Sequence, residues 1–560
     1  MFSCTVSAKI YDMKTTAVKW LYKHTGRSHA RILLTSVLNI FTSLCTVFFS
    51  LVMKDLIDCA VSGSYSEIGK YSAFIILLTV FQYISYVVAQ YMQEKTAVTC
   101  MSELRQFLIS ALLRKDYAKV QEKHSGQWVN LLFSDIKIVS DGVSSIIPGI
   151  SGMLSRLAFA FITLTVLEPF LAVIYLIGGG IILISVGFFR KKLKSLHRAV
   201  QEKEDRVHSL VQEMIENILI IKVFRAEKHF EERTIQAQED YSDVRLRRKK
   251  YRLISVNMFS FAFRMGYVAA LVYGVYELAG GSISYGTLIA VLHIVGQMRV
   301  PIYNLSGILP RIYEMTGSAE RIMAIDTAGE EVPDSSVDGF QMLTVKDVTF
   351  SYDREEVIKD ISLEIKQNDI VALTGTSGGG KSTFFLLLLG IYHPDRGIIQ
   401  IHTEQGIFEP SVQTRHLFAY VPQGNSLFSG TIRENVVFNR EYDAEKFKNA
   451  LKTADAYDFV EELPAREETL IGEKGTGLSE GQVQRISIAR AVYSDAPILL
   501  LDESTSALDE QTEARVLDNI RNMKNKTVLI VTHRPAALKI CTKHLHIDNH
   551  WISEVKNEYN

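Results

Sequence analysis

One stretch of the sequence decides the fold of the second half of the chain: Ile370-Val-Ala-Leu-Thr374, followed by Gly375-Thr-Ser-Gly-Gly-Gly-Lys381-Ser-Thr383 and an apolar run. The order predicts a short buried strand, a glycine-rich loop and a helix, and the spacing G-x-x-x-x-G-K-[ST] is typical of a triphosphate-binding loop. Backbone N–H groups of such a loop and the positive end of the helix both face phosphate oxygens. Lys381 should bridge the β- and γ-phosphates, and the Ser382 hydroxyl should bind Mg²⁺. We expect nucleotide contacts along the whole loop, from Gly375, Thr376, Ser377, Gly378, Gly379, Gly380, Lys381, Ser382 and Thr383.

A second apolar run, Ile498-Leu-Leu-Leu-Asp502-Glu503, predicts a parallel strand that is buried on both faces. Asp502 then lies at the end of the strand, where a carboxylate can bind Mg²⁺. Glu503 is placed to accept a proton from an attacking water molecule, which is the task of a general base. Two carboxylates at a strand end are also compatible with an ordinary solvated cap, but the phosphate loop favours the functional interpretation.

Two further motifs point to the same chemistry. Leu478-Ser-Glu-Gly-Gln482 precedes a helix-forming run, and Ser479 is a plausible N-cap, so that its hydroxyl and the nearby N–H groups form a second anion site. The buried strand Val528 to Thr532 ends in His533, which could contact a γ-phosphate. The soluble half therefore has two phosphate-binding helix starts.

The first half of the chain contains long apolar runs that a soluble core does not need. A bilayer core of about 30 Å is crossed by roughly 20 helical residues. Six stretches meet this requirement: Ile32 to Met53, Tyr71 to Gln93, Gly142 to Leu167, Phe170 to Phe189, Ile254 to Tyr276 and Ile283 to Ile308. Five membrane-zone residues carry polar groups that are costly in lipid and are expected to face a cavity or an interface, namely Arg156, Arg264, His293, Gln297 and Arg299. For Arg156 and Arg299 the alternative is that they snorkel to the interface near the span ends, whereas Arg264 lies mid-span, which favours a cavity-facing or paired role.

Basic residues are concentrated in the loops between spans two and three and between spans four and five, which places both loops and both termini in the cytoplasm. These loops are long and favour helix, so we expect the membrane helices to continue as polar rods. Residues 1–31 predict an interfacial helix, 32–312 a membrane domain, 313–338 a linker and 339–560 a nucleotide-binding domain. A net charge of −1 argues against a nucleic-acid partner.

Taken together, these residues resemble those of the ATP-binding cassette (ABC) exporters, over essentially the whole chain. The resemblance implies a six-helix membrane domain followed by an α/β P-loop NTPase domain, with ATP and Mg²⁺ bound. It implies that Glu503, Gln423 and His533 are catalytic and that Ser382, Gln423 and Asp502 bind the metal. Further nucleotide contacts are implied for Tyr352, which is similar to the aromatic that stacks on adenine, for Asp509 in the D-loop, and for Ser479, Gly481 and Gln482 in the signature motif.

One residue departs from that family's pattern: Glu480 replaces the middle glycine of the signature. An outward-pointing carboxylate would be screened by solvent, so we expect ATP hydrolysis to be retained. The resemblance also implies a dimer, with a second copy or a related half-transporter, and coupling helices near Tyr117–Lys123 and Ile221–Ala226.

The expected function is ATP-driven export of a hydrophobic, amphipathic or peptide substrate by alternating access, with the protein embedded in lipid in a bacterial inner membrane. A flippase for a lipid or a lipid-linked glycan is an alternative that shares every motif. An alternative of another class is a nucleotide-gated channel or a ligand sensor that does not pump.

Overall fold

The computed structural model describes residues 16–17, 19–121, 123, 125–326, 337–352, 355–376, 378–472, 475, 477–548 and 551–555. The chain divides into two compact units. The first comprises Met1–Ala111 and Ser125–Thr327, and the second comprises Leu112–His124 and Ala328–Asn560.

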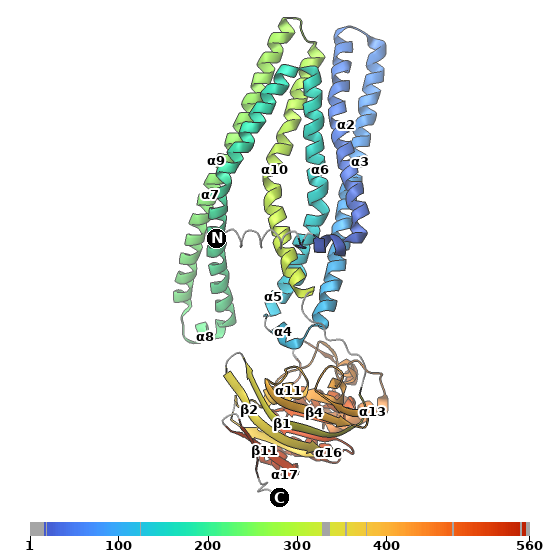
Figure 1. Cartoon of the computed structure of the whole chain (residues 1–560), viewed down its shortest axis with the longest axis vertical. Helices are drawn as coiled ribbons and strands as arrows, with labels where there is room; N and C mark the ends of the chain where they lie inside the picture. The colour runs from blue at the N-terminus through green and yellow to red at the C-terminus, as the bar shows by residue number, and fades with distance from the viewer. Residues whose placement is uncertain are drawn as a thin grey trace. The chain divides into compact units, whose positions relative to one another are not determined.

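The first unit is helical (Figure 1). After a short 3₁₀ turn, η1 (Gly26–Ser28), its long helices contain five of the six predicted spans and all of the sixth except Ile283 and Ser284. They are α2 (His29–Val61), α3 (Tyr65–Leu113), α6 (Ile136–Leu167), α7 (Pro169–Glu216), α9 (Glu227–Ala279) and α10 (Tyr285–Asp326). Among the described residues, the helical segments long and apolar enough to cross a membrane are His29–Val61, Tyr65–Leu113, Ser125–Leu167 and Glu227–Ala279, and α7 starts with the shorter apolar segment Pro169–Ile181. The sixth predicted span lies in α10, which contains Pro301 and Pro310. Helix α10 continues to Asp326, so the first part of the predicted linker is helical.

A close approach fixes the start of α10 against the end of α2. The Asp58 carboxylate accepts hydrogen bonds from the Gly286 N–H (2.8 Å) and from the Ser284 hydroxyl (2.7 Å). A Cβ atom on Gly286 would lie 2.2 Å from the Lys54 carbonyl oxygen, so any side chain at this position would force the two helices apart. Asp58 thereby satisfies a backbone N–H that a helix start would otherwise leave without a partner.

Two of the polar membrane residues lie in an interface, as predicted. His293 Nδ1 is 2.9 Å from the Ser50 hydroxyl, and Gln297 Nε2 donates to the Thr46 carbonyl oxygen (3.3 Å), so α10 and α2 are joined by polar contacts. Arg156 in α6 has a buried Nε without a hydrogen-bond partner in the described part of the chain. Arg264 and Arg299 are exposed in the single chain, so a cavity or interface around them stays a prediction.

Short helices form the tips of the two long loops that were predicted to be cytoplasmic, close to where coupling helices were expected. The first is α4 (Tyr117–Gln121), which belongs to the second unit, where the Tyr392 hydroxyl donates to Gln121 Oε1 (2.7 Å). It is followed in the chain by α5 (Ser125–Asn130) and by a π-helical turn, η2 (Leu131–Asp135). The second tip is α8 (Ile218–Val223), between the rods α7 and α9, which run side by side (Figure 1).

The second unit is built on a six-stranded sheet with the order β12-β11-β3-β10-β9-β6. Strands β3 (Ile370–Gly375), β6 (Phe418–Val421), β9 (Ile498–Asp502), β10 (Thr527–Val531) and β11 (Lys543–Asp548) run parallel, and β12 (Trp551–Val555) is antiparallel at the edge. A four-stranded antiparallel sheet has the order β2-β1-β4-β5, with β1 (Phe340–Tyr352), β2 (Glu355–Lys366), β4 (Arg396–Thr403) and β5 (Gly406–Phe408). A small pair joins β7 (Gly430–Thr431) and β8 (Leu470–Ile471).

Apart from α4, the helices of this unit lie between the strands in the sequence. They are α11 (Lys381–Leu388), α12 (Ile432–Val437), α13 (Ala444–Thr453), α14 (Tyr457–Glu462), α15 (Glu480–Tyr493), α16 (Glu510–Arg521) and α17 (Pro535–Ile540), with short 3₁₀ turns η3 (Arg415–Leu417) and η4 (Arg466–Glu468).

Burial of the central strands follows the sequence prediction. Every residue of β3, β9 and β10 is buried, as expected for parallel strands covered on both faces. Alternate residues of β3 join two different cores: Ala372 packs in the core with α15 and α16, whereas Val371 and Leu373 pack with α11 and with the four-stranded sheet. The sheet is therefore a rigid plate whose carboxyl edge can hold side chains at fixed positions.

Candidate nucleotide site

The register of the parallel strands brings the predicted motifs to one edge of the sheet. Val531 lies opposite Leu373 on one side and Asp502 on the other, and Leu501 lies opposite Val421. Residues that follow these positions come from four separate motifs, and they emerge together because the carboxyl ends of parallel strands share an edge. They are Gly375 of the phosphate loop, Glu503, Gln423 and His533.

The phosphate loop is held in shape by its own lysine. Lys381 is the first residue of α11 and is 6% exposed, and its Nζ donates to the carbonyl oxygens of Gly375 (2.8 Å) and Thr376 (2.9 Å). Gly380 has φ +94°, a conformation that other residues rarely adopt. The loop therefore curls around the ammonium group at the start of α11, and the order of strand, loop and helix is the one that the sequence predicts. The predicted contacts of Lys381 with phosphate stay a prediction. Ser377 lies outside the described residues.

Asp502 is a buried carboxylate with hydroxyl partners. It is 2% exposed, accepts a hydrogen bond from the Tyr420 hydroxyl (3.2 Å) and also hydrogen-bonds with Ser382. Burial raises the pKa of Asp502, while these hydrogen bonds and the nearby Lys381 act in the opposite direction. Burial and the adjacent Asp502 likewise raise the pKa of Tyr420. The ionised form of a carboxylate in this setting is stabilised by any positive charge that binds beside it.

Glu503 adopts an unusual backbone conformation that the sequence did not reveal. Its φ is +48°, in the left-handed region, and its N–H donates to the Val531 carbonyl oxygen (3.2 Å). Gln423 Nε2 donates to Glu503 Oε2 at 2.6 Å. Strained backbone of this kind is concentrated at functional sites. The strain and the glutamine together fix the direction of the Glu503 carboxylate.

The aromatic and histidine positions are both accessible. Tyr352 ends β1 and is 39% exposed; its ring packs edge-on against Phe350 and Tyr392, and its hydroxyl is 3.4 Å from Thr383 Oγ1. A half-exposed ring next to the phosphate loop can stack on a base. His533 follows β10 and is exposed, so its predicted contact with a γ-phosphate stays a prediction.

The signature residues form the start of α15. Ser479 is its N-cap and makes a reciprocal capping box with Gln482, as the sequence predicted for Ser479. A Cβ atom on Gly481 would lie 3.0 Å from the Ala507 carbonyl oxygen, so this glycine permits close packing. Glu480 is the first helical residue and is exposed, and its negative charge suits a helix N-terminus. The departure from the family pattern thus falls at the position that has room for a side chain.

The residues that hold the loop between Ser504 and Asp509 were not predicted from the sequence. Arg534 donates to the Leu508 carbonyl oxygen (2.7 Å) and to Glu513 Oε2 (3.0 Å). Gln484 Oε1 accepts a hydrogen bond from the Ala507 N–H (3.0 Å). Both α15 and the segment after His533 therefore hold this loop in place by hydrogen bonds. The only signal in the sequence was proximity, because Arg534 adjoins His533 and Gln484 follows the signature.

Asp509 caps α16, accepting from the N–H groups of Gln511 (3.1 Å) and Thr512 (2.9 Å), and these bonds lower the pKa of Asp509. Its predicted nucleotide contact is not tested by this geometry. The predicted residues thus form two groups: the phosphate loop with Asp502, Glu503 and Gln423, and the start of α15 with the loop before Asp509. Within the described ranges, no hydrogen bond joins the signature residues to the phosphate loop.

Comparisons with known proteins agree with this geometry. Residues 32–302 match the model for the ABC transporter transmembrane region, and residues 358–506 match the model for the ABC transporter family. A Haemophilus influenzae protein named "Probable ABC transporter ATP-binding/permease protein" is 30% identical over 81% of this chain and 83% of its own length. A Desulfotalea psychrophila protein named "ATP-dependent lipid A-core flippase" is 29% identical over 80% of this chain and 79% of its own length.

Among solved structures, that of a bacterial Atm1-family ABC exporter with ATP bound matches with a TM-score of 0.80 at 22% identity, covering 94% of each chain. The fold prediction is confirmed, with a helical membrane region followed by a nucleotide-binding domain. Such half-transporters dimerise, and this chain is an integral membrane protein. The chain therefore belongs to the ABC transporters, as an exporter-type half-transporter that couples ATP hydrolysis to the movement of a substrate.

Proposed function

We propose that two copies of this chain form a homodimeric exporter that moves a hydrophobic, amphipathic or peptide substrate out of the cytoplasm by alternating access, in a bacterial inner membrane. The observation that carries the proposal is the division of the nucleotide residues into two groups within one cassette. Each group is a helix start suited to phosphate, α11 in one and α15 in the other. A nucleotide that needs both groups is then clamped between two cassettes, and its hydrolysis releases them.

The roles of the chain's own residues follow from their positions. Glu503 accepts a proton from the attacking water, and its carboxylate is kept in position by Gln423 (2.6 Å). Lys381 turns from the loop carbonyls to the phosphate oxygens when a nucleotide is present. Tyr352 stacks on the base, and His533 contacts the γ-phosphate from the neighbouring strand end.

The donor set at Asp502 fits Mg²⁺. A buried carboxylate of raised pKa beside the Ser382 hydroxyl offers hard oxygen ligands and gains from a positive charge. In the described part of the chain there is no group of three or more His, Cys, Asp or Glu side chains placed to hold a metal. This agrees with Mg²⁺, which usually takes one or two carboxylates and substrate phosphates. Asp502, Ser382 and Gln423 would hold the ion, which would neutralise charge on the phosphates.

The short helices at the loop tips support a model in which movement of the cassettes is transmitted to the membrane helices of the dimer. Helix α8 exposes apolar side chains that would be costly to leave in water, including Leu219 (70% exposed) and Val223 (66% exposed). By contrast, α4 belongs to the same compact unit as its own cassette. We propose that α4 contacts the cassette of its own chain and that α8 docks on the cassette of the second copy.

A lipid flippase is the second candidate. It is favoured by the names of several relatives, including the flippase from Desulfotalea psychrophila described above. In this form of the proposal, the substrate is an amphipathic lipid that moves between leaflets.

The test uses sealed inside-out vesicles that contain the full-length protein. Flux of an amphipathic substrate should require ATP and should fail with a non-hydrolysable analogue and in the Glu503→Gln variant. Equal flux with ATP and with the analogue would instead identify a nucleotide-gated channel, and ATP-independent ligand binding without flux would identify a sensor.

A further inference from the structure

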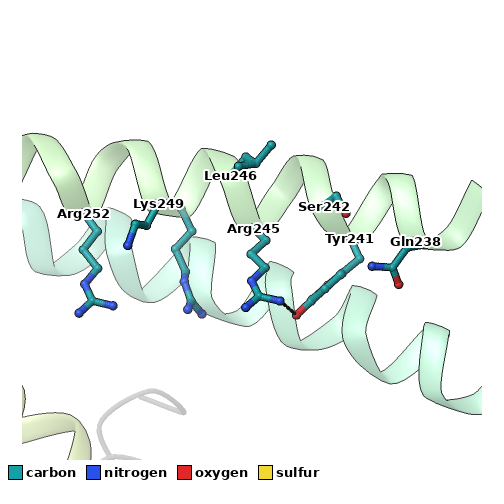
Figure 2. A pocket seen from close by; sticks show the side chains of 8 residues that line it. Gln238, Tyr241, Ser242, Arg245, Leu246, Lys249 and Arg252 are labelled. Atoms are coloured by element: carbon teal, nitrogen blue, oxygen red, sulfur yellow. Dashed lines mark hydrogen bonds between the residues drawn. The ribbon is translucent and has the colours of Figure 1, made fainter.

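One face of α9 carries a stripe of basic residues at the cytoplasmic end of the predicted fifth span. Tyr241, Arg245, Arg248, Lys249 and Arg252 follow one another at intervals that place them on the same side of a helix. They line a hollow of about 510 Å³. Figure 2 shows the Arg245, Tyr241 and Arg252 side chains extending to the same side of α9, whereas Leu246 extends to the other.

Among the described residues, the basic side chains of this face have hydrogen-bond contacts but no carboxylate within ion-pair distance. Arg245 donates to the Tyr241 hydroxyl (2.8 Å), which in turn donates to Glu204 (3.2 Å), and Arg248 is 2.9 Å from His197 Nδ1. None of the four basic residues of the stripe forms an ion pair with any described residue. Like charges at helical spacing repel one another, so this arrangement is unfavourable until an anion binds.

Arg252 also lines a second hollow, of about 320 Å³, between three membrane helices. Arg311 and Asn304 of α10 contribute further polar groups, and Met153 of α6, Val256 of α9 and Ile308 of α10 contribute apolar ones. Arg252 precedes the predicted fifth span and Arg311 follows the predicted sixth, whereas the three apolar residues lie within predicted spans. The lining is therefore cationic at its cytoplasmic end and apolar toward the membrane.

We propose that this hollow and the basic face of α9 bind the anionic headgroup of the transported molecule, so that the substrate is an amphiphile carrying a phosphate or carboxylate group. The inference rests on the exporter function proposed above. Arginine suits the role because its planar guanidinium pairs with phosphate and carboxylate through two hydrogen bonds. The apolar residues beyond Arg252 and Arg311 would receive the tail.

The orientation of the protein in the membrane does not by itself explain why these basic residues lie on one face of α9. Basic residues in cytoplasmic loops set membrane orientation on whichever helix face they lie. Arg247 and Lys250 belong to the same stretch of α9 but line neither hollow, so they can serve orientation alone. They also provide a control pair with the same charge change as the pair under test.

The experiment uses the full-length protein in phosphatidylcholine nanodiscs, with two amphiphiles of equal tail, decyl phosphate and decyl phosphocholine. Equilibrium dialysis, with empty nanodiscs subtracted, should give a Kd at least about tenfold lower for decyl phosphate, the size of one charge-assisted hydrogen bond. The Arg252→Gln/Arg311→Gln variant should lose this preference, and the Arg247→Gln/Lys250→Gln variant should keep it. Inorganic phosphate alone should compete weakly because it lacks the tail.

Three outcomes would overturn the proposal: equal or unmeasurable binding of the two amphiphiles, equal loss of preference in the control variant, or loss of preference when the nanodiscs contain phosphatidylglycerol. The last result would assign the basic face to headgroups of the surrounding bilayer. The vesicle flux test separates this inference from the function beneath it. ATP-driven transport that does not depend on headgroup charge would contradict the anion site but support the exporter function. A charge preference in binding without ATP-driven flux would support the anion site but contradict the exporter function.

Discussion

The carboxyl edge of the cassette sheet and the polar groups of the membrane unit both hold charge within the fold, but they satisfy it differently. Asp502 has Ser382, Tyr420 and Lys381 around it, supplied by the neighbouring strand β6 and by the start of α11. In the membrane unit, the buried Asp135 is paired with Arg321. Among the described residues, however, the Arg156 Nε has no hydrogen-bond partner, and the basic residues of the α9 face have hydrogen-bond contacts but no ion pair. The first region is a preformed site for chemistry, whereas the second leaves charge to be satisfied by a ligand or another chain.

The largest expected effect tests whether the cassette edge is preformed. Glu503→Gln should lower ATP hydrolysis by between about a hundredfold and ten-thousandfold, since it removes a general base, while nucleotide binding is retained. Steady-state phosphate release and nucleotide binding would be measured side by side. Glu510→Gln, an exposed carboxylate change at the start of α16, serves as the control and should hydrolyse ATP normally. Hydrolysis near the wild-type rate in Glu503→Gln would show that the left-handed conformation of Glu503 serves another purpose.

The next effect concerns the lysine that shapes the phosphate loop. Lys381→Ala should weaken ATP binding by about ten- to a hundredfold, the loss expected for charge-assisted hydrogen bonds. Fluorescent-nucleotide titration measures this directly. Lys366→Ala, which removes an exposed lysine from β2, should bind ATP as the wild type does. Unchanged affinity in Lys381→Ala would mean that its contacts with Gly375 and Thr376 are structural only.

A third prediction examines buried charge in the membrane unit. Asp135 is 3% exposed and accepts from Arg321 and from the Ser318 hydroxyl (2.8 Å). Arg321→Gln leaves the buried Asp135 carboxylate without its positively charged partner and should lower the free energy of unfolding by about 2 kcal/mol. Asp135→Asn should cost less, because the Arg321 side chain is 57% exposed and can be solvated. Thermal unfolding in detergent would compare the two, and an equal loss in both variants would show that the carboxylate is not the stranded partner.

A fourth prediction follows from the raised pKa of Asp502. A carboxyl group whose pKa is higher in the folded than in the unfolded state destabilises the fold once it ionises, so the cost is absent at acidic pH and grows as pH rises. Without nucleotide or Mg²⁺, Asp502→Asn should therefore have a Tm a few degrees above the wild type at neutral pH, and the gap should close on acidification. Differential scanning fluorimetry across pH tests this. Asp518→Asn, an exposed change, should show no such trend, and a lower Tm for Asp502→Asn at neutral pH would contradict the argument.

The smallest effect is expected at the residue that departs from the family pattern. Glu480 is exposed at the start of α15, so Glu480→Gly should change hydrolysis by less than about threefold, the size of a screened surface charge. Gly481→Ala is the informative comparison, because its Cβ atom would press on the Ala507 carbonyl oxygen. ATPase assays of both variants should show the larger loss in Gly481→Ala. The reverse order would place Glu480, rather than Gly481, against the nucleotide.

Much of the cassette was predictable because its functional residues lie in short sequence motifs at the ends of strands. A buried strand followed by glycines and Lys381 has few other interpretations, and Ser479 was identified as an N-cap from its position alone. The contact between Gln423 and Glu503 was not predictable, since it joins residues 80 positions apart in the chain. The hydrogen bonds from Arg534 and Gln484 to the loop before Asp509 were not predicted for the same reason.

The sequence by itself determined the order of spans and motifs, because hydrophobic length and glycine spacing are local properties of a chain. It also established that His293 and Gln297 needed partners, since polar groups are costly in lipid. Tertiary structure alone decided which partners those were, how the Glu503 carboxylate is oriented, and that Arg252 of α9 lines the same hollow as Arg311 of α10. These features depend on the crossing of helices and the register of strands, and such distances are fixed only when the whole chain packs.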